Sequence, residues 1–193
     1  FLSDNGAAMS NNASSFPYKG WKGNQYEGGI KTPMIMTWKN KIKSNIEFNG
    51  FISSLDIFKT SLENAGVDES LIKNADGKNI LNSLKANMPL NQDLFWRKDK
   101  MATVRSGNYK LIRLNDSSTV LYNINKNFFE DYDLKYENPL MHDSLLNKLD
   151  NWEKKLIKPN WIENKNWNIV TGMIYQDLMN NEEIRAYSPK DLN

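Results

Sequence analysis

The sequence predicts an α/β chain that ends in a small α+β subdomain. Three patterns carry this prediction: an apolar run of strand length at residues 30–38, a series of short strands separated by polar turns from Asp93 onward, and an amphipathic helix at residues 143–157. A run of short strands followed by such a helix predicts a small antiparallel sheet with the helix packed across one face. We therefore expect two parts, residues 1–92 and residues 93–193.

The first residues read as the carboxyl end of a buried strand. Phe1 and Leu2 are apolar, and the polar run Ser3-Asp4-Asn5-Gly6 follows them. Because typical strands have about 5–6 residues, we expect the strand to begin in an N-terminal portion of the chain that precedes Phe1. Residues 7–29 are rich in Gly, Asn and Ser, and their Trp and Tyr content favours an ordered, functional loop over a disordered one.

A helix is expected at residues 53–65. Ser53 or Ser54 can cap its N-terminus, and Gly66 stands where a left-handed residue ends many helices. Its expected apolar face consists of Leu55, Phe58, Leu62 and Ala65. Residues 67–92 read as a loop with one short turn at residues 80–84.

The second part begins with strands expected at residues 94–96, 101–105, 109–114 and 119–124. The helix at 143–157 has apolar residues at intervals of three and four, which is the spacing of one buried helix face. These residues are Leu145, Leu146, Leu149, Trp152 and Leu156. The tail holds a further expected helix at residues 170–180.

Composition excludes several functional classes. The 193 residues hold 25 basic and 23 acidic side chains and no cysteine, with a net charge of +2. A dedicated nucleic-acid binder would show a basic stripe, so we expect no nucleic-acid partner. No apolar run approaches the roughly 18–20 residues that cross a bilayer, so we expect no membrane span. Without cysteine, these residues supply no thiolate metal site and no cysteine nucleophile.

Two places in the chain carry groups suited to chemistry. Asp4 and Asn5 offer a carboxylate and an amide oxygen side by side, which are hard donors for Ca²⁺ or Mg²⁺. Taken alone, Asp-Asn-Gly also fits a simple turn. Lys22 lies between glycines, where the backbone can approach a ligand and the ammonium can act as a point charge for an anion. The alternative is a solvated loop lysine.

The combination of motifs is more specific than its parts, and it resembles the sulfatase family, the arylsulfatase-like hydrolases of the alkaline phosphatase superfamily. That family shows S-D-N-G, then G-K-G-x-x-x-E-G-G-x-R-x-P, and later V-R-x-G-x-W/Y-K-L-I. The matching segments, in chain order, are Ser3-Asp4-Asn5-Gly6, Lys22-Gly23, Glu27-Gly28-Gly29-Ile30-Lys31, Ala65-Gly66-Val67, Asp76-Gly77, Val104-Arg105-Ser106-Gly107-Asn108-Tyr109-Lys110-Leu111-Ile112 and Leu121-Tyr122-Asn123. The resemblance covers about residues 1–157 and leaves the role of residues 158–193 open.

The resemblance implies a fold and a site. Residues 1–92 would form the C-terminal part of an alkaline-phosphatase-like catalytic domain, truncated at its N-terminus, and residues 93–193 the C-terminal subdomain. Asp4 and Asn5 match ligands of the divalent cation, usually Ca²⁺ with Mg²⁺ as the alternative, and Lys22 matches the catalytic lysine that contacts the substrate sulfate. Glu27 and Lys31 match loop- and strand-anchoring positions, with Lys31 in place of the commoner Arg.

The resemblance also implies what lies outside these residues. The family's nucleophile is a formylglycine made from Cys or Ser in an upstream motif, so we expect residues 1–193 alone to be inactive and to need the missing N-terminal part of the same chain. The expected substrate is a sulfated small molecule or polysaccharide, and the expected location is periplasmic or extracellular. His142, the single histidine, reads as a surface or capping group.

Two alternatives stay open at this stage. Another metal-dependent hydrolase of the same superfamily, a phosphodiesterase or phosphonate hydrolase, could share the Asp-Asn region. A non-catalytic binding module formed by the small sheet and its helix would instead predict that residues 93–193 fold and bind a ligand by themselves.

Overall fold

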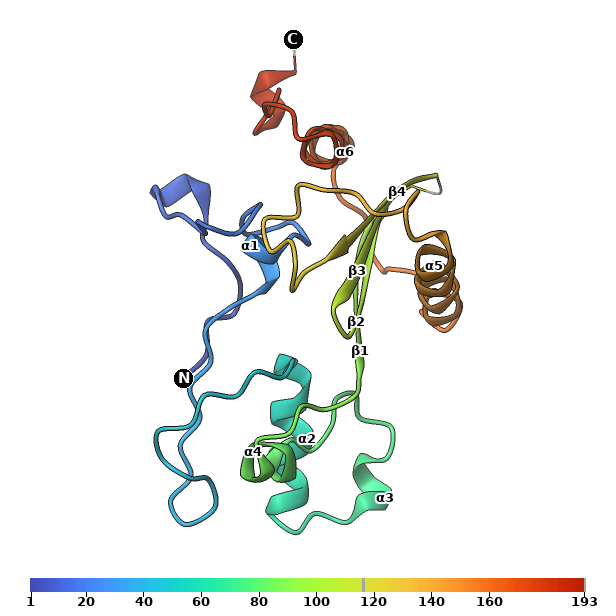
Figure 1. The fold of residues 1–193 in the computed structure, drawn as a ribbon. Helices are drawn as coiled ribbons and strands as arrows, with labels where there is room; N and C mark the ends of the chain where they lie inside the picture. The colour runs from blue at the N-terminus through green and yellow to red at the C-terminus, as the bar shows by residue number, and fades with distance from the viewer. Residues whose placement is uncertain (116, 193) are drawn as a thin grey trace. The chain divides into compact units, whose positions relative to one another are not determined.

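Residues 1–115 and 117–192 are described by a computed structural model in which the chain forms two compact units (Figure 1). The first unit contains Phe1–Asp4 and Pro33–Gln92, and the second contains Asn5–Thr32 and the chain from Asp93 onward. One boundary between the units falls between Gln92 and Asp93. Residues 5–32 belong to the same compact unit as the chain from Asp93 onward.

The first unit holds three helices, α2 (Ser54–Asn64), α3 (Glu69–Ile72) and α4 (Leu81–Ala86). The expected helix at 53–65 is confirmed as α2. Ser53 and Asp56 form a capping box at its start, in which the Ser53 hydroxyl accepts from the Leu55 N–H at 3.2 Å and the Ser53 N–H donates to the Asp56 carboxylate at 2.7 Å. Gly66, with φ of +80°, follows the helix in the left-handed conformation expected there.

The buried face of α2 is polar, which corrects the expected apolar face. Leu55 and Phe58 are 54% and 56% exposed, whereas Asp56 and Thr60 are buried. The Asp56 carboxylate accepts from the Lys78 N–H at 2.8 Å, and the Thr60 hydroxyl accepts from the Ile80 N–H at 3.0 Å. These hydrogen bonds satisfy the turn before α4, so the helix presents its polar side to that turn.

The expected strand at residues 30–38 is wrong. Residues 27–30 form the short helix α1 (Glu27–Ile30), and the apolar run beyond it makes one isolated bridge, between Leu2 and Met34. The Ile35 N–H donates to the Phe1 carbonyl at 2.8 Å beside that bridge. No longer ladder forms from this run among the described residues.

The second unit is built on an antiparallel meander, as expected. Its strands β1 (Asp93–Lys98), β2 (Met101–Ser106), β3 (Tyr109–Leu114) and β4 (Ser118–Asn123) pair in chain order. Side chains alternate between the two faces of the sheet. One face holds Ala102, Val104, Leu111 and Leu121. The other face holds Met101, Ile112, Val120 and Tyr122.

Helix α5 (Pro139–Glu153) lies against one face of the sheet (Figure 1). It covers the first face through buried Leu145 and Leu149, and the Trp152 ring stacks on Phe95 at 5.0 Å. A helix on one face is therefore confirmed, but it begins and ends four residues earlier than the expected range 143–157. The Asn138 side chain accepts from the Met141 N–H at 3.3 Å, and Pro139 occupies the first helical turn. Both features start the helix before Asp143.

Helix α6 (Lys165–Asn180) packs against the second face through Tyr175 and Leu178. It begins five residues before the expected start, because the Asn164 side chain caps it by accepting from the Asn166 N–H at 2.9 Å. Tyr26, from the segment 5–32, is fully buried in the same cluster. Two short 3₁₀ turns complete the unit, η1 (Met9–Asn11) and η2 (Pro189–Asp191). Among the described residues, no helix combines the length and the apolar character that a membrane crossing needs.

Candidate functional site

The segment 5–32 is held in shape by its own backbone. The Lys22 N–H donates to the Ala7 carbonyl at 2.9 Å, and the Gly6 N–H donates to the Gly29 carbonyl at 3.0 Å. The Gly28 N–H donates to the Lys19 carbonyl at 2.8 Å. The backbone of Lys22 is therefore fixed beside the residues that directly follow Asn5.

Glycine is required at two of these contacts. A Cβ on Gly6 would lie 1.8 Å from the Gly28 carbonyl oxygen, and a Cβ on Gly28 would lie 2.3 Å from the Gly20 carbonyl oxygen. Neither neighbour is a flexible side chain that could move aside. The glycines of this loop therefore allow backbone to pack against backbone, which gives the motif a physical reason.

The Lys22 side chain projects from this loop into solvent. It is exposed, and its ammonium makes no hydrogen bond or ion pair within residues 1–115 and 117–192. A loop lysine whose backbone is fixed and whose charge is uncompensated is suited to hold an anion.

Lys22 lines a cavity of about 480 Å³ in the second unit. One wall comes from residues 8–10 and 21–24, and another from α6 and the chain that follows it. The lining includes Trp21, Lys22, Asn24, Glu163, Trp167 and Tyr187. Small-molecule sites in proteins range over roughly 300–1,000 Å³ and combine apolar walls with a few polar groups, and this cavity has that character.

A buried charge network attaches the loop to the sheet. Glu27 is fully buried, and its carboxylate lies 2.9 Å from Arg105 on β2 and 3.0 Å from Lys110 on β3. Lys110 is also fully buried and lies 2.8 Å from the Glu130 carboxylate. The Glu27 N–H donates to Glu130 at 2.7 Å, which closes the network. Two basic and two acidic side chains thus fix α1 on the strands.

The two carboxylates of this network differ in acidity. Burial opposes the ionisation of Glu27, but the charges of Lys110 and Arg105 outweigh it and hold the pKa of this carboxyl below its ordinary value. Burial raises the pKa of Glu130, and Lys110 only partly offsets that effect. Glu27 is therefore the more firmly ionised of the two, and Glu130 takes up a proton at the higher pH.

Lys19 serves the same attachment. Its ammonium donates to the Glu130 carbonyl at 3.0 Å and to the Asn181 side chain at 2.6 Å, and it lies 5.1 Å from the centre of the Tyr26 ring. Burial lowers the pKa of Lys19 to about 8. Its contacts join the loop to the chain after β4 and to the end of α6, so we assign Lys19 a structural role.

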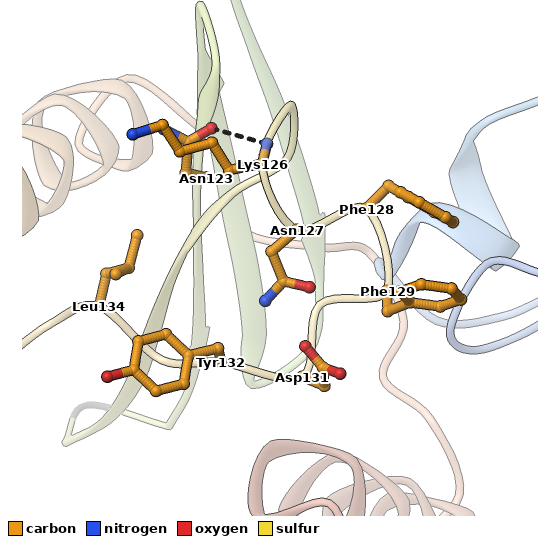
Figure 2. Close-up of a pocket in the computed structure, with 8 residues that line it drawn as sticks. All are labelled: Asn123, Lys126, Asn127, Phe128, Phe129, Asp131, Tyr132 and Leu134. Carbon is orange, nitrogen blue, oxygen red and sulfur yellow. Dashed lines mark hydrogen bonds between the residues drawn. The ribbon is translucent and has the colours of Figure 1, made fainter.

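A second cavity, of about 420 Å³, lies in the loop after β4 (Figure 2). Figure 2 shows the Asn127 side chain between Tyr132 and Leu134 on one side and Phe128 and Phe129 on the other. The Phe128 ring meets Tyr18 edge-on at 6.2 Å. This loop therefore contacts the segment 5–32 through aromatic packing as well as through Glu130.

Comparisons with known proteins give the family. Residues 1–67 match the protein-family model described as Sulfatase. A sulfatase of Formosa agariphila is 30% identical over a stretch that covers 86% of this chain and 34% of that protein. The N-acetylgalactosamine-6-sulfatase of Canis lupus familiaris is 30% identical and covers 57% of this chain and 22% of that protein.

The chain belongs to the sulfatase family. It spans about a third of the length of the Formosa agariphila sulfatase. Among solved structures, Ps i-CgsB in complex with k-i-k-neocarrahexaose matches with a TM-score of 0.77 at 24% identity, covering 88% of this chain and 39% of that one. The PsFucS1 sulfatase from Pseudoalteromonas sp. matches with a TM-score of 0.58 at 23% identity, covering 77% of this chain and 37% of that one. These likenesses show a shared fold.

The structure shows which contacts several residues of the sulfatase motifs make. Glu27 anchors the loop, as expected, and its partners Arg105 and Lys110 are the basic residues of the later V-R-x-G-x-Y-K-L-I motif. Lys31, which stands in place of an Arg, has its ammonium 4.4 Å from the centre of the Tyr18 ring. The motif residues thus meet across the second unit although they are far apart in sequence.

The expected cation ligands, Asp4 and Asn5, stand on either side of the division between the two units. Asp4 is exposed, and its carboxylate has no hydrogen bond or ion pair within residues 1–115 and 117–192. Carboxylate and amide oxygens fit the chemistry of Ca²⁺, which takes about 6–8 oxygen ligands. No group of three or more His, Cys, Asp or Glu that could hold a metal occurs in the described part of the chain. Asp4 and Asn5 therefore suit a divalent cation but form a partial ligand set.

His142 is half-buried within α5, whose cap is Asn138, so the surface or capping role expected from the sequence is wrong. Its Nε2 lies 2.9 Å from the Thr119 hydroxyl on β4, and its Nδ1 lies 3.0 Å from Asp143. Four residues of the cavity and the charge network carry no signal in the sequence: Asn24, Glu130, Glu163 and Tyr187. Trp167 reads there as a packing residue. Residues 158–193 lie beyond the sulfatase motifs, so only the aromatic content of the tail could have drawn attention to Trp167 and Tyr187.

Proposed function

We propose that this chain is the C-terminal part of a sulfatase that hydrolyses sulfate esters of a carbohydrate. One observation carries the proposal: the unpaired ammonium of Lys22 stands on a loop fixed by buried charges and lines a cavity, within the segment that matches the sulfatase model. The relatives support this assignment, since several of them are named as sulfatases.

In this proposal, the Lys22 ammonium stabilises the negative charge of the substrate's sulfate group. Hydrolysis of a sulfate ester by S–O cleavage builds negative charge on the non-bridging oxygens, and a fixed cation stabilises that charge. Asp4 and Asn5 would hold a divalent cation, Ca²⁺ or Mg²⁺, which supplies further charge neutralisation when bound. A formylglycine made from a Cys or Ser outside residues 1–193 would supply the nucleophile, so these residues alone are expected to be inactive.

The substrate class rests on the relatives. Ps i-CgsB was solved with k-i-k-neocarrahexaose, and BT4656 was solved with D-glucosamine-2-N,6-O-disulfate. Relatives in several mammals are N-acetylgalactosamine-6-sulfatases. All three names point to sulfated carbohydrates, and we extend that class to this chain. We also propose a periplasmic or extracellular location, where such polymers are met.

The test is hydrolysis of 4-nitrophenyl sulfate by the full-length protein that carries this chain. We expect Lys22→Ala and Asp4→Ala each to lower kcat/KM by about 100-fold or more, because each removes a group that stabilises developing charge. Lys43→Ala is the matched control, since Lys43 is an exposed loop lysine of the first unit. Near-normal rates for Lys22→Ala would refute its role.

The same assay separates the alternatives. A phosphodiesterase would turn over bis(4-nitrophenyl) phosphate faster than 4-nitrophenyl sulfate, and that result would replace the sulfatase assignment. An independent binding module at residues 93–193 has less support, because Gln25, Tyr26 and Glu27 are buried in the same unit as the sheet. The Gln25 N–H donates to the Tyr175 hydroxyl oxygen at 2.7 Å, and the Thr103 hydroxyl donates to the Gln25 side chain at 2.7 Å.

A further inference from the structure

We propose that the cavity beside Lys22 is a binding subsite for a second sugar ring, so that this sulfatase acts on oligosaccharides rather than on isolated sulfated sugars. The inference rests on the proposed function, in which Lys22 holds the sulfate of the reacting unit. It assigns a specificity role to Trp167 and Tyr187, which come from α6 and the chain after it.

The aromatic lining is the first support. Trp167 and Tyr187 are 45% and 50% exposed, although both belong to a unit with a well-formed core. The Trp21 ring lies 6.1 Å from the Tyr187 ring at an angle of 41°, so the two form a bent aromatic wall. Large aromatic side chains left accessible in a cavity give a flat apolar surface, which suits the C–H face of a pyranose ring.

A buried donor without a partner is the second, independent support. Asn24 is only 5% exposed and lines the cavity, and its Nδ2 has no hydrogen-bond partner in the described part of the chain. Its Oδ1 accepts from the Tyr26 N–H at 3.3 Å, which fixes the amide. Buried polar groups in native proteins are nearly always paired, so an orphan amide at a cavity wall indicates an oxygen-bearing ligand. Sugar hydroxyls supply such oxygens.

Charge around the cavity favours a ligand that combines hydroxyls with an anionic group. Glu163 lies 3.4 Å from Lys98 and accepts from the Thr171 hydroxyl at 3.3 Å, so this carboxylate is held in place and can also accept from a sugar hydroxyl. Lys98 offsets its charge, while the Lys22 ammonium has no acidic partner. Lys22 therefore leaves an uncompensated positive charge on the cavity lining, which suits a sulfate group.

The place of these residues in the chain explains why they would govern specificity. Trp167 and Tyr187 lie outside residues 1–67, which match the sulfatase model, and outside the later motifs that end near residue 157. Lys22 and the two aromatic side chains thus come from separate stretches of sequence that meet at one cavity. Such an arrangement lets the outer wall vary without change to the sulfate-contacting loop.

The test compares oligosaccharide and aryl substrates in the full-length protein. We expect Trp167→Ala and Tyr187→Ala to lower the ratio of kcat/KM for k-i-k-neocarrahexaose or a chondroitin 6-sulfate hexasaccharide to kcat/KM for 4-nitrophenyl sulfate by at least about tenfold, through KM. Trp161→Ala is the matched control, because Trp161 is 83% exposed in the same tail and does not line the cavity. Calorimetric titration with the same hexasaccharides measures binding directly.

The outcomes separate this inference from the proposed function. An unchanged ratio in both aromatic variants, or hydrolysis of 4-nitrophenyl sulfate without binding of either hexasaccharide, would overturn the subsite and leave the sulfatase assignment intact. If no sulfate ester is hydrolysed but a hexasaccharide binds and Trp167→Ala weakens it at least tenfold, the subsite stands and the proposed activity fails.

Discussion

Replacing Lys110 with Met removes the ammonium that lies between two buried carboxylates. Met keeps the length and the apolar stem of the side chain, so packing in the sheet changes little. The charge changes greatly, because Glu27 and Glu130 lie 3.0 and 2.8 Å from the Lys110 ammonium and all three side chains are fully buried. The variant therefore tests the electrostatic part of the attachment by itself.

The expected loss in the free energy of unfolding follows from the partners that each carboxylate retains in the variant. Glu27 retains Arg105 at 2.9 Å, while Glu130 retains the Glu27 N–H at 2.7 Å but no cationic side chain within salt-bridge distance in the described residues. Removing one partner of a buried ion pair costs about 3–5 kcal/mol, because the other charge stays buried without compensation. We therefore expect Lys110→Met to lower the free energy of unfolding by about 3–5 kcal/mol at pH 7. The loss should be smaller at pH 5, since burial already raises the pKa of Glu130 and protonation removes its charge.

Native-state hydrogen exchange of the β2 and β3 amides in the full-length protein measures this loss locally. A loss of 3 kcal/mol or more corresponds to exchange that is faster by more than about 100-fold. Lys148→Met is the matched control: Lys148 pairs with Asp93 at 2.9 Å, but its side chain is 41% exposed, so we expect about 0–1 kcal/mol. Equal effects of the two substitutions would refute the reasoning.

Two further substitutions test other parts of the chain. Lys19 has its pKa lowered to about 8 by burial, so the unfolded chain binds more protons above that pH and this group makes stability rise from pH 8 towards 10. Lys19→Met should remove that rise in urea unfolding midpoints, and an unchanged pH profile would contradict the burial of its charge. Ser53→Ala removes the α2 cap and should cost about 1 kcal/mol, seen as roughly fivefold faster exchange of α2 amides. Ser54→Ala, at the exposed first position of the helix, should change this exchange little.

The meander could be predicted from the sequence because its strands pair with their neighbours along the chain, and the turns that join them have characteristic residues. Turn residues such as Ser106-Gly107-Asn108 separate the short apolar runs, and strands joined by tight turns pair with their neighbours. The start of α5 cannot be located from hydrophobic spacing, because its first turn is set by the Asn138 cap and by Pro139 and not by apolar residues. The strand expected at 30–38 failed for a different reason: an apolar run forms a strand only where a partner exists, and the sequence does not state the partner.

The candidate site was only partly predictable. Lys22, Asp4 and Asn5 came from a resemblance between motifs, since a lysine between glycines or an Asp-Asn pair is unspecific alone. The anchoring of Glu27 could not be derived from spacing, because Arg105 and Lys110 are 78 and 83 residues away in sequence. Trp167 reads as ordinary packing until the fold brings it to the cavity that holds Lys22.

The long reach of the Glu27 network has a consequence for synthesis on the ribosome. The hydrogen bond between the Glu27 N–H and Glu130 joins positions 103 residues apart. At translation rates of about 5–20 residues per second, Glu27 waits roughly 5–20 s after its own synthesis before Glu130 exists. The buried network around Glu27 can therefore close only after all four strands of the meander have been made.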